Sequence, residues 1–135
     1  MADPRPSVTR FVRAVVRAEI ARGGDARDLD VAGRILNRLR EDLGKLLGPA
    51  GIDVLLSRSL VLARRVHPVL AGVTTGPGGT LEGLGDVARD GAAIQEAVTA
   101  ILSHFVELLV LLIGEELAMR LVRDVWPAAV EEETK

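Results

Sequence analysis

Apolar residues recur at helical spacing along most of the chain. Intervals of three and four residues separate the hydrophobic positions, and this spacing places them on one face of an α-helix. The segments with this pattern are 7–22, about 29–47, about 52–66 and about 92–126. Gly23-Gly24, Gly48-Pro49, Pro68 and Pro127 interrupt or end it, because these residues terminate helices. The pattern predicts an all-α bundle of four or five helices.

The last of these segments is the most apolar. One stripe consists of Ile94, Val98, Ile101, Phe105, Leu108 and Leu112, and an adjoining one of Leu102, Val106, Val110, Ile113, Leu117 and Leu121. A helix that is apolar over so much of its circumference is either the spine of a bundle or part of an oligomer interface. We therefore expect a central C-terminal helix, bent or broken at Gly114, and a homodimer as a secondary expectation.

A glycine-rich connector at 72–91 precedes this helix. It holds seven of the fourteen glycines of the chain. Val73-Thr74-Thr75 and Thr80-Leu81 flank its first glycine cluster, and β-branched residues on either side of such a turn favour a short hairpin. The length of 135 residues suits one domain, which we place at 1–127, followed by an acidic, solvated tail at 128–135.

Composition narrows the classes of function. The chain has no cysteine, which excludes disulfides and thiolate chemistry, and a formal charge of −2. Its aromatic residues are Phe11, Phe105 and Trp126, too few to stack nucleic-acid bases. The apolar stretch 97–114 contains Ser103, His104 and Glu107, which argues against a membrane span. With no apolar signal sequence at the N-terminus, the expected location is the cytoplasm, and 15 arginines against two lysines suggest a bacterial host.

Charge is divided unevenly between the two halves. Residues 1–65 carry 13 basic and 8 acidic side chains, whereas residues 66–135 carry 4 and 11. The first helix contributes Arg10, Arg13 and Arg17 on the side opposite its apolar face. These arginines are candidate interaction residues for an anionic partner. Alternatively, the two halves attract each other within the chain.

His104 and Glu107 are the best candidates for a polar site. They are three residues apart on a helix, the spacing of ligands in helix-bundle metal sites. Only one other histidine, His67, is present and no second such pair, so we predict no metal site. We also predict no cofactor and no catalytic residues. We expect a buried Glu107 to pair with Arg64 or Arg65. Ser57, Ser59 and Ser103 lack the sequence context of a nucleophile.

Trp126, the only tryptophan, ends the last helix. Leu117, Leu121 and Val125 are expected to continue the inward stripe, which places the indole at the rim of the bundle. A tryptophan there is either a cap over the core, the reading we favour, or an anchor for a partner.

Two segments carry a resemblance. Ile113–Pro127 and Leu81–Leu84 resemble small uncharacterised all-helical bacterial proteins associated with signalling or conflict-system gene neighbourhoods. The resemblance implies an interaction module and no established activity. The expected function is a non-enzymatic adaptor or regulatory subunit that binds another protein. The alternative is a small ligand-binding or enzymatic bundle that uses His104 and Glu107.

Overall fold

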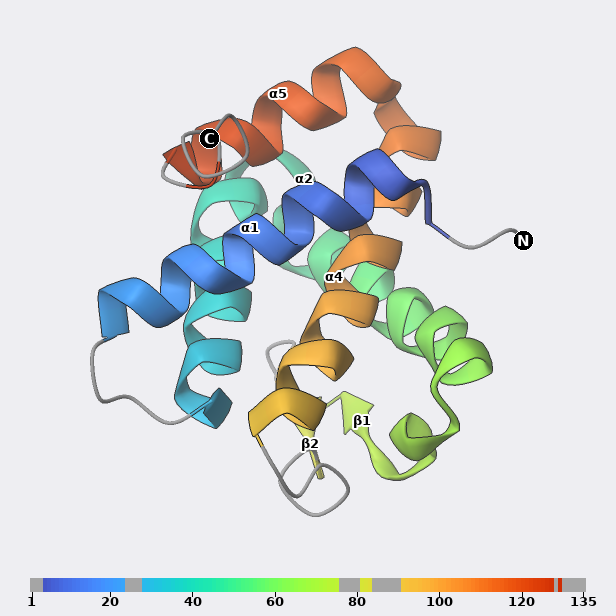
Figure 1. Cartoon of the computed structure of the whole chain (residues 1–135). Coiled ribbons are helices and arrows are strands. Elements are labelled where there is room, and N and C mark those ends of the chain that lie inside the picture. Colours follow the sequence, from blue (N-terminus) through green and yellow to red (C-terminus); the bar gives the residue numbers. More distant parts are fainter. Residues whose placement is uncertain (1–3, 24–27, 76–80, 84–90, 128, 130–135) are drawn as a thin grey trace.

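Helices make up most of the structure. Figure 1 shows the computed structural model, which describes residues 4–23, 28–75, 81–83, 91–127 and 129. Within these residues the elements are α1 (Pro6–Gly23), α2 (Asp28–Val66), the 3₁₀-helix η1 (Pro68–Gly72), β1 (Thr74–Thr75), β2 (Leu81–Glu82), α4 (Gly91–Ile113) and α5 (Glu115–Val125). The prediction of an all-α bundle is confirmed.

Two glycines divide the long helical stretches. Gly48 has φ 78° and ψ 158° inside α2, so α2 consists of two helical segments close to the predicted 29–47 and 52–66. Gly114 has φ 91° and separates α4 from α5. A residue with a Cβ is disfavoured at such positive φ values, and these positions therefore fix where the chain changes direction. The bend or break expected at Gly114 is therefore a break, and the last helical segment of the sequence forms two helices.

The predicted hairpin is present in a minimal form. β1 and β2 pair antiparallel, with Thr74 opposite Glu82 and Thr75 opposite Leu81. Val73 precedes β1, where it is buried in the core. The glycine cluster at 76–79 and Thr80 lie outside the described residues.

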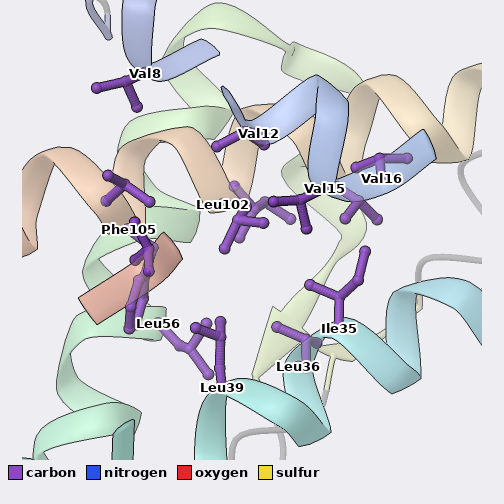
Figure 2. Packing of buried hydrophobic residues seen from close by; sticks show 14 of the residues in the cluster. Val8, Val12, Val15, Val16, Ile35, Leu36, Leu39, Leu56, Leu102 and Phe105 are labelled. Atoms are coloured by element: carbon purple, nitrogen blue, oxygen red, sulfur yellow. The ribbon is translucent and has the colours of Figure 1, made fainter. Parts of the chain in front are cut away.

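Helices α2 and α4 contribute similar shares of the core, and α4 contacts α1, α2 and α5. In Figure 2, valines of α1 face Leu102 and Phe105 of α4, and α2 closes the cluster from the other side. The labelled α1 and α2 members are Val8, Val12, Val15, Val16, Ile35, Leu36, Leu39 and Leu56. This packing confirms the helical periodicity read from the sequence.

Three leucines that were predicted to face inward are exposed. Leu46 lies just before the Gly48 interruption, and Leu112 and Leu117 lie on either side of Gly114. The inward face of α5 consists instead of Ala118, Val122 and Val125. The stripe was wrong beyond Gly114 because the chain turns there, so that α5 does not continue the helical phase of α4.

Two segments are long and apolar enough to pass a test for membrane-spanning helices, Gly33–Val66 and Ala93–Ile113. The core helix of a bundle passes the same test, and more than half of the apolar window in the second segment is buried. The lack of a membrane span therefore stays a prediction.

Candidate functional site

Ion pairs connect the basic N-terminal half to the acidic C-terminal half. Arg5 Nε lies 3.0 Å from Glu107 Oε1, and Arg5 Nη1 lies 3.0 Å from Glu115 Oε2. Arg13 Nη1 lies 2.6 Å from Glu96 Oε1. Part of the uneven charge is thus used within the chain, where Arg5 and Arg13 hold the N-terminal segment and α1 against α4 and the start of α5.

The partner predicted for Glu107 was wrong. Arg5 binds this carboxylate, and Arg65 is exposed to solvent. Arg64 instead donates hydrogen bonds to the carbonyl oxygens of Leu70 and Val73. It thereby fixes η1 against the end of α2. The sequence indicates that Arg64 lies near the end of a helix. It does not indicate that the following turn, η1, folds back so that its carbonyl groups reach Arg64.

A buried carboxylate, Glu19, was not recognised as a candidate. Its side chain is 2% exposed and lies 3.5 Å from both Arg34 Nε and Arg38 Nε of α2. Arg34 also donates to the Glu19 backbone oxygen at 2.8 Å. Position 19 follows the helical repeat of Val12, Val15 and Val16, so the signal was a charged residue within an apolar stripe.

A pocket of about 190 Å³ with several polar lining residues lies between α1, the end of α2 and α4. We call it the histidine pocket, because both histidines of the chain line it, together with Thr9, Arg13, Glu96 and Ser103. Pro68 disfavours the helical conformation at His67, so α2 ends at Val66. His67 lies in the turn that follows, at the wall of the pocket. His104 and Ser103 come from the middle of α4, where both are almost fully buried.

Some polar groups that line the histidine pocket have hydrogen-bond partners within the described part of the protein and others do not. Glu96 accepts hydrogen bonds from Arg13 at 2.6 and 3.3 Å, and the Thr99 hydroxyl donates to the Gln95 carbonyl at 2.7 Å. Ser103 Oγ is buried and has no hydrogen-bond partner among the described residues. A buried hydroxyl without a partner costs free energy, so a ligand or water that bonds to it would stabilise the site.

The ion pair at the pocket shifts the ionisation of both partners. Hydrogen bonds from Arg13 lower the pKa of Glu96 below its ordinary value, an effect that partial burial opposes and that His67 reinforces. The same hydrogen bonds raise the pKa of Arg13. Both side chains therefore carry full charge at neutral pH.

His104 and Glu107 do not form one site. His104 lines the histidine pocket, whereas Glu107 is not among the lining residues and binds Arg5. Residues three positions apart on a helix lie on the same broad face. The Glu107 carboxylate nevertheless points to Arg5, which lies just before α1, and not into the pocket. Among the described residues, no three His, Asp or Glu side chains are arranged to hold a metal ion.

The other predicted site residues are dispersed. Arg10 and Arg17 are exposed on α1. Ser59 is buried and donates to the Leu55 carbonyl at 2.6 Å, while Ser57 is exposed. These serines lie on α2 and are not among the residues that line the histidine pocket.

Trp126 lies inside the fold. Its exposure is 2%, and its backbone N–H donates to Val122 O at 3.1 Å. Ala129 is also buried, two residues beyond the predicted domain end, whereas 128 and the acidic 130–135 lie outside the described residues. The burial of the indole matches a cap over the core more closely than an exposed anchor.

The junction of α4 and α5 exposes apolar side chains. Leu111, Leu112 and Leu117 are 70%, 62% and 43% exposed. Glu116 and Arg120 form an ion pair at 3.5 Å on α5 and line the same surface hollow as Leu117. We call this surface, residues 111–120, the elbow.

Comparison of the chain with protein-family models, curated proteins and solved structures gives no match. The class that the structure itself defines is an all-α bundle with a polar pocket inside its helix packing and an apolar elbow at one end.

Proposed function

We propose that this protein is a non-enzymatic protein–protein interaction module, an adaptor or regulatory subunit, that docks through the elbow. The observation that carries the proposal is the exposure of Leu111, Leu112 and Leu117 within seven residues of one another. Exposed leucines close together in the sequence of a folded domain favour a contact surface, because burying each one against a partner lowers the free energy.

The surroundings of the leucines support this role. Glu116, Arg120 and Arg123 are exposed on α5 next to Leu117. An apolar centre with a charged rim is the usual anatomy of a protein interface. Because the rim carries both signs, two copies of α5 packed antiparallel would bring Glu116 of each copy opposite the arginines of the other.

A second copy of the chain is therefore the partner we commit to. In a twofold interface the same patch serves both subunits, and opposite charges at its two ends make the patch complementary to itself. We include in the proposal the role in bacterial signalling or defence and the cytoplasmic location that were expected from the sequence.

Sedimentation velocity at tens of micromolar tests the proposal, since this concentration exceeds typical specific dissociation constants. The wild type is expected to sediment as a dimer, and the double variant Leu111→Ser/Leu112→Ser as a monomer with an unchanged helical spectrum. The matched control Leu46→Ser/Val54→Ser removes two equally exposed apolar side chains from α2. It should remain a dimer.

A monomeric wild type would overturn the proposal. Equal dissociation of the control would also overturn it, because the effect would then reflect general surface hydrophobicity and not the elbow.

A further inference from the structure

The histidine pocket has the size and chemistry of a ligand site that is separate from the elbow. We propose that it binds a small organic carboxylate with an apolar body. None of the exposed leucines of the elbow lines the pocket. The inference therefore does not rest on the proposed interaction function, and each can fail without the other.

The volume limits the ligand. The pocket holds about 190 Å³, and one water molecule occupies about 30 Å³ in the liquid, so the space corresponds to about six waters. A molecule of roughly six to nine non-hydrogen atoms fits this volume.

Hydrogen-bonding capacity favours an anion. Among the lining residues, the one carboxylate, Glu96, already accepts two hydrogen bonds from Arg13. The Thr99 hydroxyl already donates to the Gln95 carbonyl, but the hydroxyls of Thr9 and Ser103 and further guanidinium N–H groups of Arg13 can donate. An ionised carboxylate only accepts hydrogen bonds, so it complements this excess of donors.

Ser103 supplies the most specific observation. Its residue exposure is 2%, it is one of the residues that line the pocket, and its buried Oγ lacks a hydrogen-bond partner among the described residues. A carboxylate oxygen within reach of this hydroxyl would satisfy the donor. The site therefore offers a buried hydrogen bond that the protein leaves unmade.

The remaining wall is apolar. Pro4, Val66 and Ala100 line the pocket without polar side-chain atoms. They would cover a ring or short alkyl group while the carboxylate meets the donors. Benzoate, with nine non-hydrogen atoms, has both features and serves as the probe.

The test is an NMR titration of the full-length protein with three probes that share one ring. Benzoate is anionic, benzamide neutral and benzamidine cationic. We expect benzoate to shift the amide signals of residues lining the pocket with a dissociation constant of about 1 mM or lower. Benzamide should bind about tenfold more weakly, and benzamidine should leave the pocket signals unchanged.

Two variants connect binding to the pocket. Ser103→Ala is expected to weaken benzoate binding about three- to tenfold through loss of one hydrogen bond. The matched control is Ser59→Ala, which alters a buried serine that donates to Leu55 O on α2. Its affinity for benzoate should equal that of the wild type. Thr9→Val removes a second lining hydroxyl from α1 and keeps the test valid if Ser103→Ala is unstable.

Two results would overturn the proposal. One is tighter or equal binding of benzamide or benzamidine, which would show that the pocket does not select an anion. The other is the absence of pocket shifts with benzoate at tens of millimolar, far above the expected dissociation constant. A normal dimer in Ser103→Ala would separate either failure from a failure of the elbow.

Discussion

The two ends of α4 differ in burial although both are rich in leucine, isoleucine and valine. From Ile94 to Leu109 most of the apolar side chains are buried against α1, α2 and α5, with Phe105 at 0% exposure. At the other end, Leu111 and Leu112 face solvent. Burial of an apolar side chain therefore depends on which neighbouring elements reach that part of the helix.

The reason for the difference is geometric. Gly114 redirects the chain, and α5 packs back through Ala118, Val122 and Val125. In Figure 1, α5 runs across one end of the bundle and does not extend α4 in a line. The last turn of α4 consequently lacks cover on its outer side.

The largest expected effect contrasts these two ends directly. Phe105→Ala should lower the free energy of unfolding by about 3–5 kcal/mol, because it leaves a cavity in the core. Leu112→Ala should change it by less than about 0.5 kcal/mol, because the side chain is already in water. Urea denaturation of monomeric samples measures both. Similar losses for the two variants would refute the contrast in burial.

Trp126→Ala is expected to lower the unfolding free energy by about 3 kcal/mol or more, since its indole is buried at the end of α5. Thermal unfolding followed by circular dichroism provides the measurement. Unchanged stability together with a lost dimer would assign Trp126 to the interface instead of the cap.

Glu19→Gln tests the buried charge between α1 and α2. The expected loss is about 1–3 kcal/mol, because Arg34 and Arg38 lose a charged partner but still reach solvent. Glu116→Gln, on the exposed elbow, is the control and should cost less than about 0.5 kcal/mol. If both variants have equal stability by urea denaturation, the buried ion pairs contribute no more than surface ones.

The smallest effect is a change in acid sensitivity. The pKa of Glu96 is lower in the folded state, so its pairing with Arg13 stabilises the protein above the ordinary carboxyl pKa of about 4.5. This contribution is lost as the pH falls through the lower, folded-state pKa. Glu96→Gln should flatten the decline of stability below about pH 4.5 by less than about 1 kcal/mol, because half of the side chain is exposed. If the decline of stability below about pH 4.5 is the same in Glu96→Gln and the wild type, the pairing of Glu96 with Arg13 does not stabilise the fold.

The helices were predictable because they depend on local spacing and on helix-ending residues. Val8, Val12 and Val15 repeat at intervals of three and four, and Pro68 ends α2 where the sequence indicates. The hairpin followed from threonines beside a glycine cluster. These features need no knowledge of distant contacts.

The sites were harder to predict because they join segments far apart in the sequence. His67 and His104 meet in one pocket although 37 positions separate them. Glu107 pairs with Arg5, more than a hundred residues away, instead of a nearer arginine. The spacing of His104 and Glu107 on one helix could not show that His104 would line a pocket while Glu107 pairs with Arg5. Only the packing of α1 across α4 decides this.

The most direct test of the central claim is dipolar electron spin resonance on a chain labelled at the elbow. The protein has no cysteine, so Glu116→Cys accepts a single spin label at the rim of the leucines. If two copies meet at the elbow, the labels on the two copies are close enough for a measurable dipolar coupling. The double variant Leu111→Ser/Leu112→Ser should abolish this coupling. A label at Val54→Cys on α2 should give a longer distance or none. Two results would contradict the proposal that the elbow is the contact surface. One is the absence of dipolar coupling between labels at position 116 at tens of micromolar protein. The other is stronger coupling between labels at position 54.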